Sequence, residues 1–365
     1  MLSAPVDLAT STRTGAHVLF VAWRDLANPA AGGSEVLVDR LAAGMVERGH
    51  RVSLLAGGPS TARPYQVVRS GGRLSQFLRA PLVYGRRLRD CDVVVEVCNG
   101  MPFLTPLWSD KPTICMVNHV HTEMWPLEFP APIAAAGSFL ERRVMPWAHR
   151  RNLVLTVSPS TAQALADLGV DRERIRILRN GVEAPAERYP RSSGPLFVAL
   201  GRLTAHKRID LLLRLWERVR PITGGQLVIV GDGPERARLE ALAGPDVVFT
   251  GRVDEETKQR LLGQAWLLLH PASVEGWGIV VAEAAVRGTP AIGFSVPGLR
   301  DSVVHGETGL LAGTESEFVS HWASLALDDA RRLRAGEAAR TRALEFTWDG
   351  AVRTFADVVD EALTR

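Results

Sequence analysis

Residues 17–55 read HVLFVAWRDLANPAAGGSEVLVDRLAAGMVERGHRVSLL, and this stretch decides the fold class. The apolar run His17–Trp23 predicts a buried strand, and a loop that ends in two glycines follows it. A helix is then expected over Ser34–Arg48, because its apolar residues recur with a period of about 3.6 residues. Arg51–Leu55 is the next predicted strand. Strand, loop, helix and strand form the repeating unit of a parallel sheet covered by helices.

The same unit recurs along the rest of the chain. Continuous aliphatic runs predict further buried strands at Asp92–Val97, Thr113–Val117 and Leu153–Val157. The stretch Gly181–Pro195 contains three prolines and no periodic pattern, so we interpret it as an interdomain linker. A second series of strands and helices begins at Leu196. The pattern predicts an α/β protein with two Rossmann-like domains whose parallel sheets face each other across a cleft.

The composition indicates an ordinary globular protein, with 46% hydrophobic and 23% charged residues in a chain of 365. No run of about 18 apolar residues is present, and the N-terminus lacks the pattern of a signal peptide, so we expect a cytoplasmic protein without a transmembrane helix. The three cysteines lie in or beside apolar runs, which favours free thiols in a reducing compartment. They form no Cys-x-x-Cys pair, and we expect neither a metal cofactor nor a nucleic-acid partner.

Positive charge is concentrated in the first half of the chain. Residues 1–180 contain 21 Lys and Arg against 15 Asp and Glu, whereas residues 181–365 contain 22 against 25. Between Arg63 and Arg89 lie seven arginines and no acidic residue, interleaved with Leu74, Phe77, Leu78, Leu82, Val83 and Leu88. Such a segment either packs its apolar side on its own sheet or makes a peripheral contact with an anionic membrane. Pro81 is expected to interrupt or start any helix there.

Two motifs lie where such sheets bind ligands, at the carboxyl ends of strands beside helix N-termini. Gly32-Gly33 either forms a flexible loop or lets the backbone approach a phosphate or sugar closely. Arg202 and Lys207 follow the first strand of the second domain. They either cap a surface turn or bind a diphosphate, and their position at a strand end favours the diphosphate.

The segment 270–278, HPASVEGWG, is the strongest local signal. It follows a predicted buried strand, and the amides of Gly276–Ile279 open a helix and can therefore hold a diphosphate. Glu275 and Glu283 can each accept hydrogen bonds from sugar or ribose hydroxyls. Glu283 could instead be a solvated helix residue, but its neighbours are apolar, and a carboxylate in a buried helix needs a partner.

Together these motifs resemble the family-4 retaining glycosyltransferases of the GT-B fold. Pro271–Gly293 is similar throughout to that family's Glu-x7-Glu signature region. Further motifs of the family occur in the right order, so that the resemblance covers about residues 17–363: Gly32-Gly33-Ser34-Glu35, Val157-Ser158, Asn180-Gly181, Val198–Lys207 and Leu227–Pro234.

The resemblance implies a role for each matching residue. Glu275 would hold hydroxyls of the transferred sugar, and Glu283 would hold the ribose. Arg202 and Lys207 would neutralise the diphosphate leaving group. The other donor-binding residues would surround them: Gly32 and Gly33 on the cleft floor, Gly201 and Gly231 in the diphosphate motifs, Arg252 and Val253 along the base, and Gly276, Trp277, Gly278 and Ile279 at the helix start.

The resemblance also implies how the domains divide the work. Residues 1–184 would bind the acceptor, residues 185–345 would bind the nucleotide sugar, and residues 346–365 would form a helix that crosses back to the first domain. In this family a histidine after the strand Thr113–Val117 approaches the donor sugar, usually within His-Asp. This chain has His119-Val120-His121, so either histidine can be the equivalent one, and His119 is favoured.

Another motif points elsewhere and is discounted. Asp90-Cys91-Asp92 mimics the Asp-x-Asp metal motif of a different glycosyltransferase class. It precedes a predicted strand, at the edge of the sheet opposite to the ligand edge.

The expected activity is transfer of a hexose-type sugar from a UDP- or GDP-sugar to an unidentified hydroxyl acceptor, with retention of configuration and without metal. Arg202, Lys207, Glu275 and one of the two histidines would act in catalysis. The product would be a cell-envelope glycan, a glycolipid or a natural-product glycoside. Three alternatives on the same fold stay open, namely a nucleotide-sugar epimerase, an inverting transferase and a catalytically inactive nucleotide-sugar-binding subunit. A nicotinamide dehydrogenase is the weakest alternative, because the dinucleotide fingerprint G-x-G-x-x-G is missing.

Overall fold

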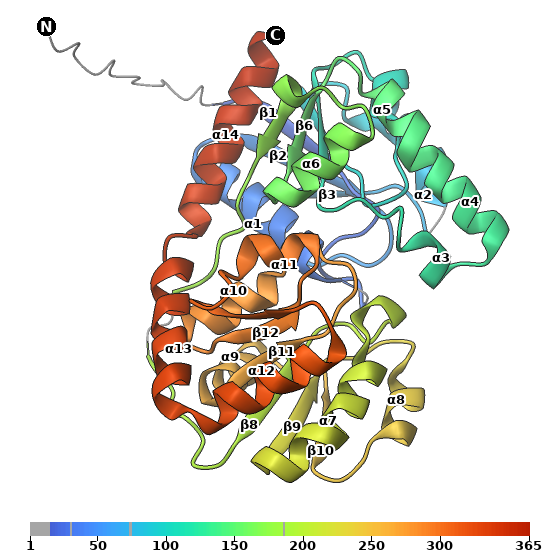
Figure 1. The fold of residues 1–365 in the computed structure, drawn as a ribbon. Helices are drawn as coiled ribbons and strands as arrows, with labels where there is room; N and C mark the ends of the chain where they lie inside the picture. Colours follow the sequence, from blue (N-terminus) through green and yellow to red (C-terminus); the bar gives the residue numbers. More distant parts are fainter. Residues whose placement is uncertain (1–14, 30, 73–74, 185–186) are drawn as a thin grey trace, which may run out of the picture.

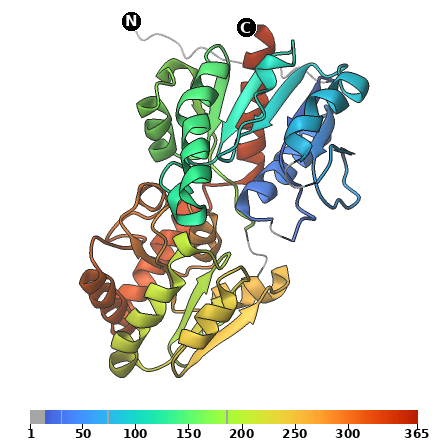
Figure 2. The same cartoon turned by 90° about the vertical axis from the view of Figure 1, so that its right-hand side faces the viewer.

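The protein has two lobes, each built on one parallel sheet with helices on its faces (Figures 1 and 2). The computed structural model describes residues 15–365 except residues 30, 73–74 and 185–186. Within these residues no helix is both long and apolar enough to cross a membrane. The predicted α/β class with two Rossmann-like lobes is confirmed.

The first sheet has seven parallel strands in the order β3-β2-β1-β4-β5-β6-β7. Four of its inner strands, β1, β4, β5 and β6, are buried along their whole length, as their aliphatic sequences require of a sheet covered on both faces. The bounds are β1 (His17–Val21), β2 (Arg51–Ala56), β3 (Gln66–Arg69), β4 (Val93–Val97), β5 (Thr113–Val117), β6 (Leu153–Thr156) and β7 (Ile175–Ile177).

The second sheet repeats the topology with six parallel strands in the order β10-β9-β8-β11-β12-β13. In both sheets the chain starts near the middle, runs to one edge and then returns to fill the other side. The bounds are β8 (Leu196–Leu200), β9 (Gln226–Val230), β10 (Val247–Gly251), β11 (Leu267–His270), β12 (Ala291–Phe294) and β13 (Gly309–Ala312).

Helices connect these strands and cover the sheets (Figure 1). In the first lobe they are α1 (Gly33–Glu47), α2 (Ser75–Arg87), α3 (Trp125–Glu128), α4 (Ala131–Phe139), the π-helical turn η2 (Leu140–Val144), α5 (Met145–Ala148) and α6 (Pro159–Asp167), with the 3-10 turns η1 (Thr105–Leu107) and η3 (Arg172–Arg174). In the second they are η4 (Ala205–Lys207), α7 (Ile209–Thr223), α8 (Arg236–Leu242), α9 (Glu255–Gln264), α10 (Ile279–Val286), α11 (Pro297–Ser302), α12 (Glu315–Leu327) and α13 (Asp329–Ala343).

The last helix, α14 (Trp348–Thr364), packs on the first lobe although it follows the second lobe in the chain (Figure 1). Phe355 of α14 is fully buried and stacks on Phe20 of β1, with ring centroids 5.4 Å apart. α14 also lies so close to α1 that a side chain at Gly44 would collide with Val352. The helix therefore ties the end of the chain to the first sheet.

One local prediction is wrong. Pro81 was expected to interrupt or start a helix, but α2 runs through it from Ser75 to Arg87. A proline inside a helix has no N–H to donate, so the carbonyl four residues before it loses its hydrogen bond and needs another partner, such as water. Pro81 and Phe77, whose carbonyl loses that bond, are both partly exposed, so solvent can satisfy the carbonyl.

Candidate active site

Both sheets reverse their strand order at one point, between β1 and β4 in the first lobe and between β8 and β11 in the second. Loops leaving the carboxyl ends of strands beside such a point form the usual ligand crevice. Gly32 and Gly33 follow β1, Arg202 and Lys207 follow β8, and Glu275 follows β11. The structure therefore gathers residues far apart in the sequence at the two switch points.

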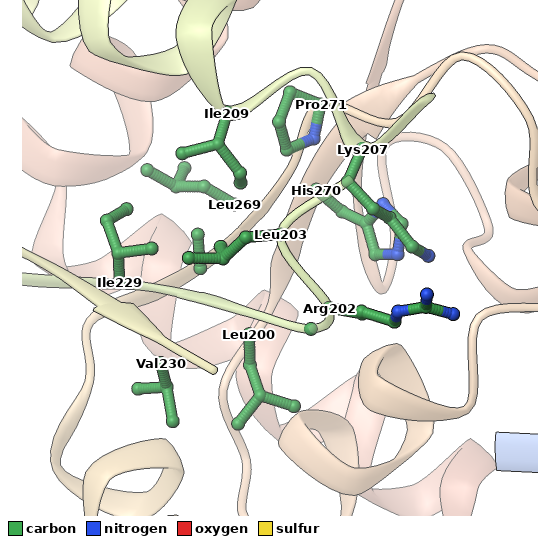
Figure 3. A pocket seen from close by; sticks show the side chains of 12 residues that line it. Leu200, Arg202, Leu203, Lys207, Ile209, Ile229, Val230, Leu269, His270 and Pro271 are labelled. Atoms are coloured by element: carbon green, nitrogen blue, oxygen red, sulfur yellow. The ribbon is translucent and has the colours of Figure 1, made fainter. Parts of the chain in front are cut away.

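The loop after β8 brings cationic side chains to a small pocket. Figure 3 shows Arg202, Lys207 and His270 extending to one side of this pocket, while aliphatic side chains line the other. Gly201 is one of the residues that line it, and Gly231, which follows β9, has a φ of 129°. A side chain at Gly231 would strike the carbonyl of Gly201, so only glycine allows the loops after β8 and β9 to meet.

Glu275 forms an ion pair with Lys207. The distance from Lys207 Nζ to Glu275 Oε2 is 2.6 Å, and the exposed fractions of the two side chains are 22% and 17%. His270 Nε2 lies 3.1 Å from the same oxygen, and the amide of Gly276 donates to Oε1. Burial raises the pKa of Glu275, but Lys207 and His270 outweigh it and hold that pKa well below its ordinary value. Glu275 is therefore a carboxylate.

The turn between Glu275 and α10 contains Gly276 and Gly278, and its backbone lies close to the first lobe. Gly278 is the N-cap of α10, with a φ of 85° that favours glycine. A side chain at Gly276 would come within 2.5 Å of the Asn118 carbonyl oxygen, and one at Gly33 within 3.2 Å of Ile279 Cγ2. The starts of α1 and α10 thus approach each other across the lobes, and both present amides that can bind anionic oxygens.

Glu283 lies further along α10, in a different electrostatic environment. Its Oε1 accepts a hydrogen bond of 2.7 Å from Lys258 Nζ of α9. Burial raises the pKa of Glu283 above its ordinary value, although Lys258 opposes this shift. The pKa values of the two site glutamates are therefore shifted in opposite directions, down for Glu275 and up for Glu283. Sequence reasoning did not identify Lys258, because no pattern links positions 258 and 283.

The two histidines occupy different places in the loop after β5. His119 approaches the donor loop, since a side chain at Gly276 would lie 3.1 Å from His119 Cβ. Burial, and secondarily His121, lower the pKa of His119 well below its ordinary value, so its imidazole is neutral. The His121 ring stacks on that of His119 with centroids 3.8 Å apart. Of these two histidines His119 lies against the turn that follows Glu275, and the ring of His121 packs on it. That His119 reaches the donor sugar stays a prediction.

Glu141 fixes the loop after β5, and no sequence pattern predicts this role. It lies in the π-helical turn η2, and its side chain is 2% exposed. Glu141 Oε1 accepts a hydrogen bond of 2.6 Å from the amide of His121. Its Oε2 accepts from Thr122 Oγ1 and Trp125 Nε1 at 3.2 and 3.3 Å. A π-helical turn shifts the helix register, and such turns are frequent at functional sites.

Direct contacts hold the lobes together beside the site. Ser158 Oγ, at the N-cap of α6, donates to the Gly276 carbonyl at 2.7 Å. On the other side, His206 Nδ1 of the basic loop η4 lies 2.8 Å from Glu128 Oε1 of α3. Both contacts involve a residue next to Glu275 or Lys207, so the relative position of the lobes fixes the site geometry.

Three further residues expected at the donor site, Trp277, Arg252 and Val253, differ in how exposed their side chains are. The Trp277 side chain is 4% exposed and packs edge-on against Phe346, so its backbone alone can face a donor. Arg252 is exposed just after β10, and Val253 packs partly against the second lobe's core. The structure places both next to α9, which carries Lys258.

The discounted acidic motif is structural. Asp90 binds Arg51 Nη1 at 2.6 Å, and Asp92 accepts a hydrogen bond from the amide of His17 at 2.7 Å. Both residues lie at the amino edge of the first sheet, away from Glu275. In the described part of the chain, no group of three or more His, Cys, Asp and Glu side chains could hold a metal ion.

Comparison with known proteins gives two family matches in chain order. Residues 31–184 match the family described as Glycosyltransferase Family 4, and residues 184–342 match Glycosyl transferases group 1. Together the matches span both lobes.

Individual relatives match shorter stretches. A GDP-mannose-dependent alpha-mannosyltransferase of Corynebacterium glutamicum is 30% identical over 197 residues, which are 52% of this chain and 46% of that protein. A glycogen synthase of Mycobacterium tuberculosis is 29% identical over 219 residues, or 56% of this chain and 53% of that enzyme. The chain spans about half the length of the curated relatives it matches.

Solved structures match over nearly the whole chain. Sucrose-phosphate synthase from Thermosynechococcus elongatus superposes with a TM-score of 0.80 at 20% identity, covering 95% of this chain and 98% of that one. The Anabaena protein HepE in complex with UDP and glucose gives a TM-score of 0.78 at 16% identity, with 95% and 100% covered. These likenesses establish the GT-B fold. With both lobes matched in order by the two family descriptions, the chain belongs to glycosyltransferase family 4.

Proposed function

We propose that this protein is a retaining glycosyltransferase that moves a hexose from a UDP- or GDP-sugar to a hydroxyl group. The observation that carries the proposal is the Lys207–Glu275 pair at the start of α10, beside the neutral His119. It combines a cation for a diphosphate, a carboxylate for sugar hydroxyls and helix amides in one place.

The chemistry follows from where charge develops. As the glycosidic bond to the diphosphate breaks, negative charge grows on the leaving oxygen and the sugar becomes oxocarbenium-like. Arg202, Lys207 and the amides of Gly276–Ile279 would stabilise the leaving group without a metal. In the part of the chain that the structure describes, we identify no carboxylate as a covalent nucleophile, so we expect the acceptor to attack from the face that the diphosphate leaves. Chelator should then leave turnover unchanged, and NMR of the first product should show a retained anomer.

The donor base and sugar require direct assay. Several matched relatives carry names that specify GDP-mannose, whereas the matched HepE structure contains UDP and glucose. Mass spectrometry of nucleotide-sugar hydrolysis should therefore begin with GDP-mannose and UDP-glucose, first without acceptor and then with glycan and lipid hydroxyl acceptors. An epimerase would yield no second sugar-bearing product, and an inactive binding subunit would yield no product at all.

Two substitutions test the site assignment. Glu275→Ala should mainly lower turnover, because it removes the carboxylate that we propose binds the sugar hydroxyls. Glu283→Ala should mainly weaken nucleotide binding, because it removes the carboxylate that we propose binds the ribose. Unchanged steady-state constants for both variants, with thermal unfolding showing intact folds, would overturn the assignment.

We further propose that helix α2 makes a peripheral contact with an anionic membrane, which would suit a lipid-linked acceptor. Leu78 and Leu82 are 82% and 61% exposed on its outer face, beside the exposed Arg79, Arg86 and Arg87. Part of the apolar side packs inward instead, since the core of this lobe holds Phe77, Val83 and Leu88. Leu74 lies outside the described residues.

Vesicle sedimentation tests this contact. Each arginine near an anionic surface contributes roughly 1 kcal/mol and is screened by salt, so binding should occur at low salt and disappear at high salt. Replacing Arg86, Arg87 and Arg89 with Gln should abolish it, whereas the same change at Arg331 and Arg334 of the second lobe should not. A wild-type protein that stays in the supernatant at low salt would exclude the contact.

A further inference from the structure

The expected ribose carboxylate, Glu283, is held by a lysine from a neighbouring helix. Glu283 projects from α10 among buried apolar residues, and its side chain is 19% exposed. Lys258, of α9, is 18% exposed and donates to Glu283 Oε1 at 2.7 Å. α9 packs beside α10, so the pair connects two helices of the donor lobe.

The ammonium of Lys258 has two carboxylate partners. Besides Glu283 it contacts Glu255 Oε2 at 3.0 Å, within its own helix. Burial alone would lower the pKa of Lys258, but the two glutamates raise it above its ordinary value, so the lysine stays charged. Among the described residues, Lys258 is bound to Oε1 of Glu283 and no hydrogen bond engages Oε2. One carboxylate oxygen therefore stays available to a ligand.

The cation at position 258 is a lysine, although nearly all cationic residues of the chain are arginines. The sequence contains 40 arginines and three lysines, and two of those lysines, Lys207 and Lys258, pair with the two site glutamates. An ammonium is a compact point charge, whereas a guanidinium forms a flat fork that tends to engage both carboxylate oxygens. A lysine thus suits a site where the second oxygen must stay free.

Lys258 also lies close in sequence to the residues expected along the base. α9 begins at Glu255, directly after Arg252 and Val253. A movement of this segment toward a bound base would shift α9 and with it the contact to Glu283. Base recognition and ribose recognition can therefore be linked through one short helix.

We propose that Lys258 is a positioning residue for the nucleotide: it holds Glu283 by one oxygen so that the other accepts hydrogen bonds from the ribose hydroxyls. The inference rests on the proposed function, in which Glu283 binds ribose. It assigns Lys258 no contact with the nucleotide itself. Its effect on affinity must therefore pass through Glu283.

A double-mutant cycle tests this dependence. Calorimetry would measure binding of UDP and of GDP to the wild type, Lys258→Met, Glu283→Gln and the double variant. Lys258→Met should weaken the accepted nucleotide about tenfold, the effect of one charge-assisted hydrogen bond. In the Glu283→Gln background, Lys258→Met should change affinity by less than about twofold, because the carboxylate through which Lys258 acts is already absent. Lys111→Met, which removes the third lysine at the amino edge of the first sheet, is the matched control.

The preference for a ribonucleotide over its dideoxy counterpart is a second measurement, and a mere loss of packing would not change this preference. The wild type should prefer the ribonucleotide to its 2′,3′-dideoxy counterpart, and Lys258→Met should lose most of that preference. Lys258→Arg should restore affinity only in part, because the fork also engages the second oxygen. If Lys258→Met fails to fold in thermal unfolding, Lys258→Gln takes its place in the cycle.

The outcomes separate this inference from the proposed function. A wild type that binds neither UDP nor GDP overturns the proposed function and this inference with it. A wild type that binds while Lys258→Met binds equally well overturns the inference alone. Equal weakening in both backgrounds also overturns it, because Lys258 would then contact the nucleotide directly.

Discussion

Replacing Lys207 with Met should destabilise the protein through Glu275. The methionine keeps most of the aliphatic stem but removes the ammonium 2.6 Å from Glu275 Oε2. The carboxylate then keeps the Gly276 amide and the imidazole of His270, whose pKa is lowered by burial so that it is neutral. Burial, which raises the pKa of Glu275, is no longer opposed by a full positive charge.

The size of the effect follows from the burial of the pair. Removing one partner of a buried ion pair costs about 3–5 kcal/mol. Because Lys207 and Glu275 keep 22% and 17% exposure and Oε1 keeps its amide donor, we expect a smaller cost than for a fully buried pair, about 2–3 kcal/mol at pH 7. The loss should be smaller at pH 4 than at pH 7, because protonation of Glu275 in the variant removes the unpaired charge.

The sign of the pH dependence follows from linkage. In the wild type the folded pKa of Glu275 is depressed, so its stabilisation is present above the ordinary pKa and is lost as pH falls through the folded value. In the variant the folded pKa is raised instead, so the unfolding free energy falls as pH rises toward the new value. The gap between the two proteins must therefore widen from acidic to neutral pH.

Urea unfolding of four proteins at pH 4 and pH 7 measures this gap. They are the wild type, Lys207→Met, Glu275→Gln and the double variant. Lys207→Met should cost much less in the Glu275→Gln background, where no carboxylate is left unpaired. A destabilisation that is equal at both pH values, or equal in both backgrounds, would refute the electrostatic account of this pair.

Three further outcomes are expected. Glu141→Gln should lower turnover about tenfold while calorimetry shows unchanged nucleotide binding, because an amide replaces one of the two oxygens that anchor His121 and its neighbours. Phe355→Ala should reduce the unfolding free energy by about 3–5 kcal/mol in urea, and a loss below about 1 kcal/mol would contradict the packing of α14 on Phe20. Asp90→Asn should change the steady-state rate less than about twofold, and a large loss would reopen a metal role.

The parts of the site that the sequence predicts are the local ones. Arg202, Lys207 and Glu275 each follow a buried strand within a few residues, and strand ends in parallel sheets meet at one edge. The fold was predictable for the same reason, since each inner strand is a continuous aliphatic run. The short edge strands β3 and β7 contain polar residues and were not predicted. The edge strand β13 is apolar but only four residues long, and it was not predicted either.

The supporting residues could not be predicted, because tertiary packing brings them to the site. Glu141 reaches the His121 loop across 20 positions, through a π-helical turn that no periodic pattern indicates. Lys258 meets Glu283 across 25 positions, from a helix whose side-by-side packing the sequence does not specify. Trp277 lies within the strongest motif, yet its side chain packs against Phe346, a contact that depends on the returning end of the chain.

Two residues expected to hold the donor, Lys207 and Glu275, form an ion pair with each other. A bound diphosphate would draw Lys207 away from Glu275, which leaves a buried carboxylate in need of a new donor. A nucleoside diphosphate alone supplies none, whereas a nucleotide sugar offers its hydroxyls. We therefore expect the nucleotide sugar to bind more tightly than the matching diphosphate, and Glu275→Gln to reduce that difference, as measured by calorimetry on both ligands. Equal affinities in the wild type would mean that Lys207 and Glu275 do not separate when the donor binds.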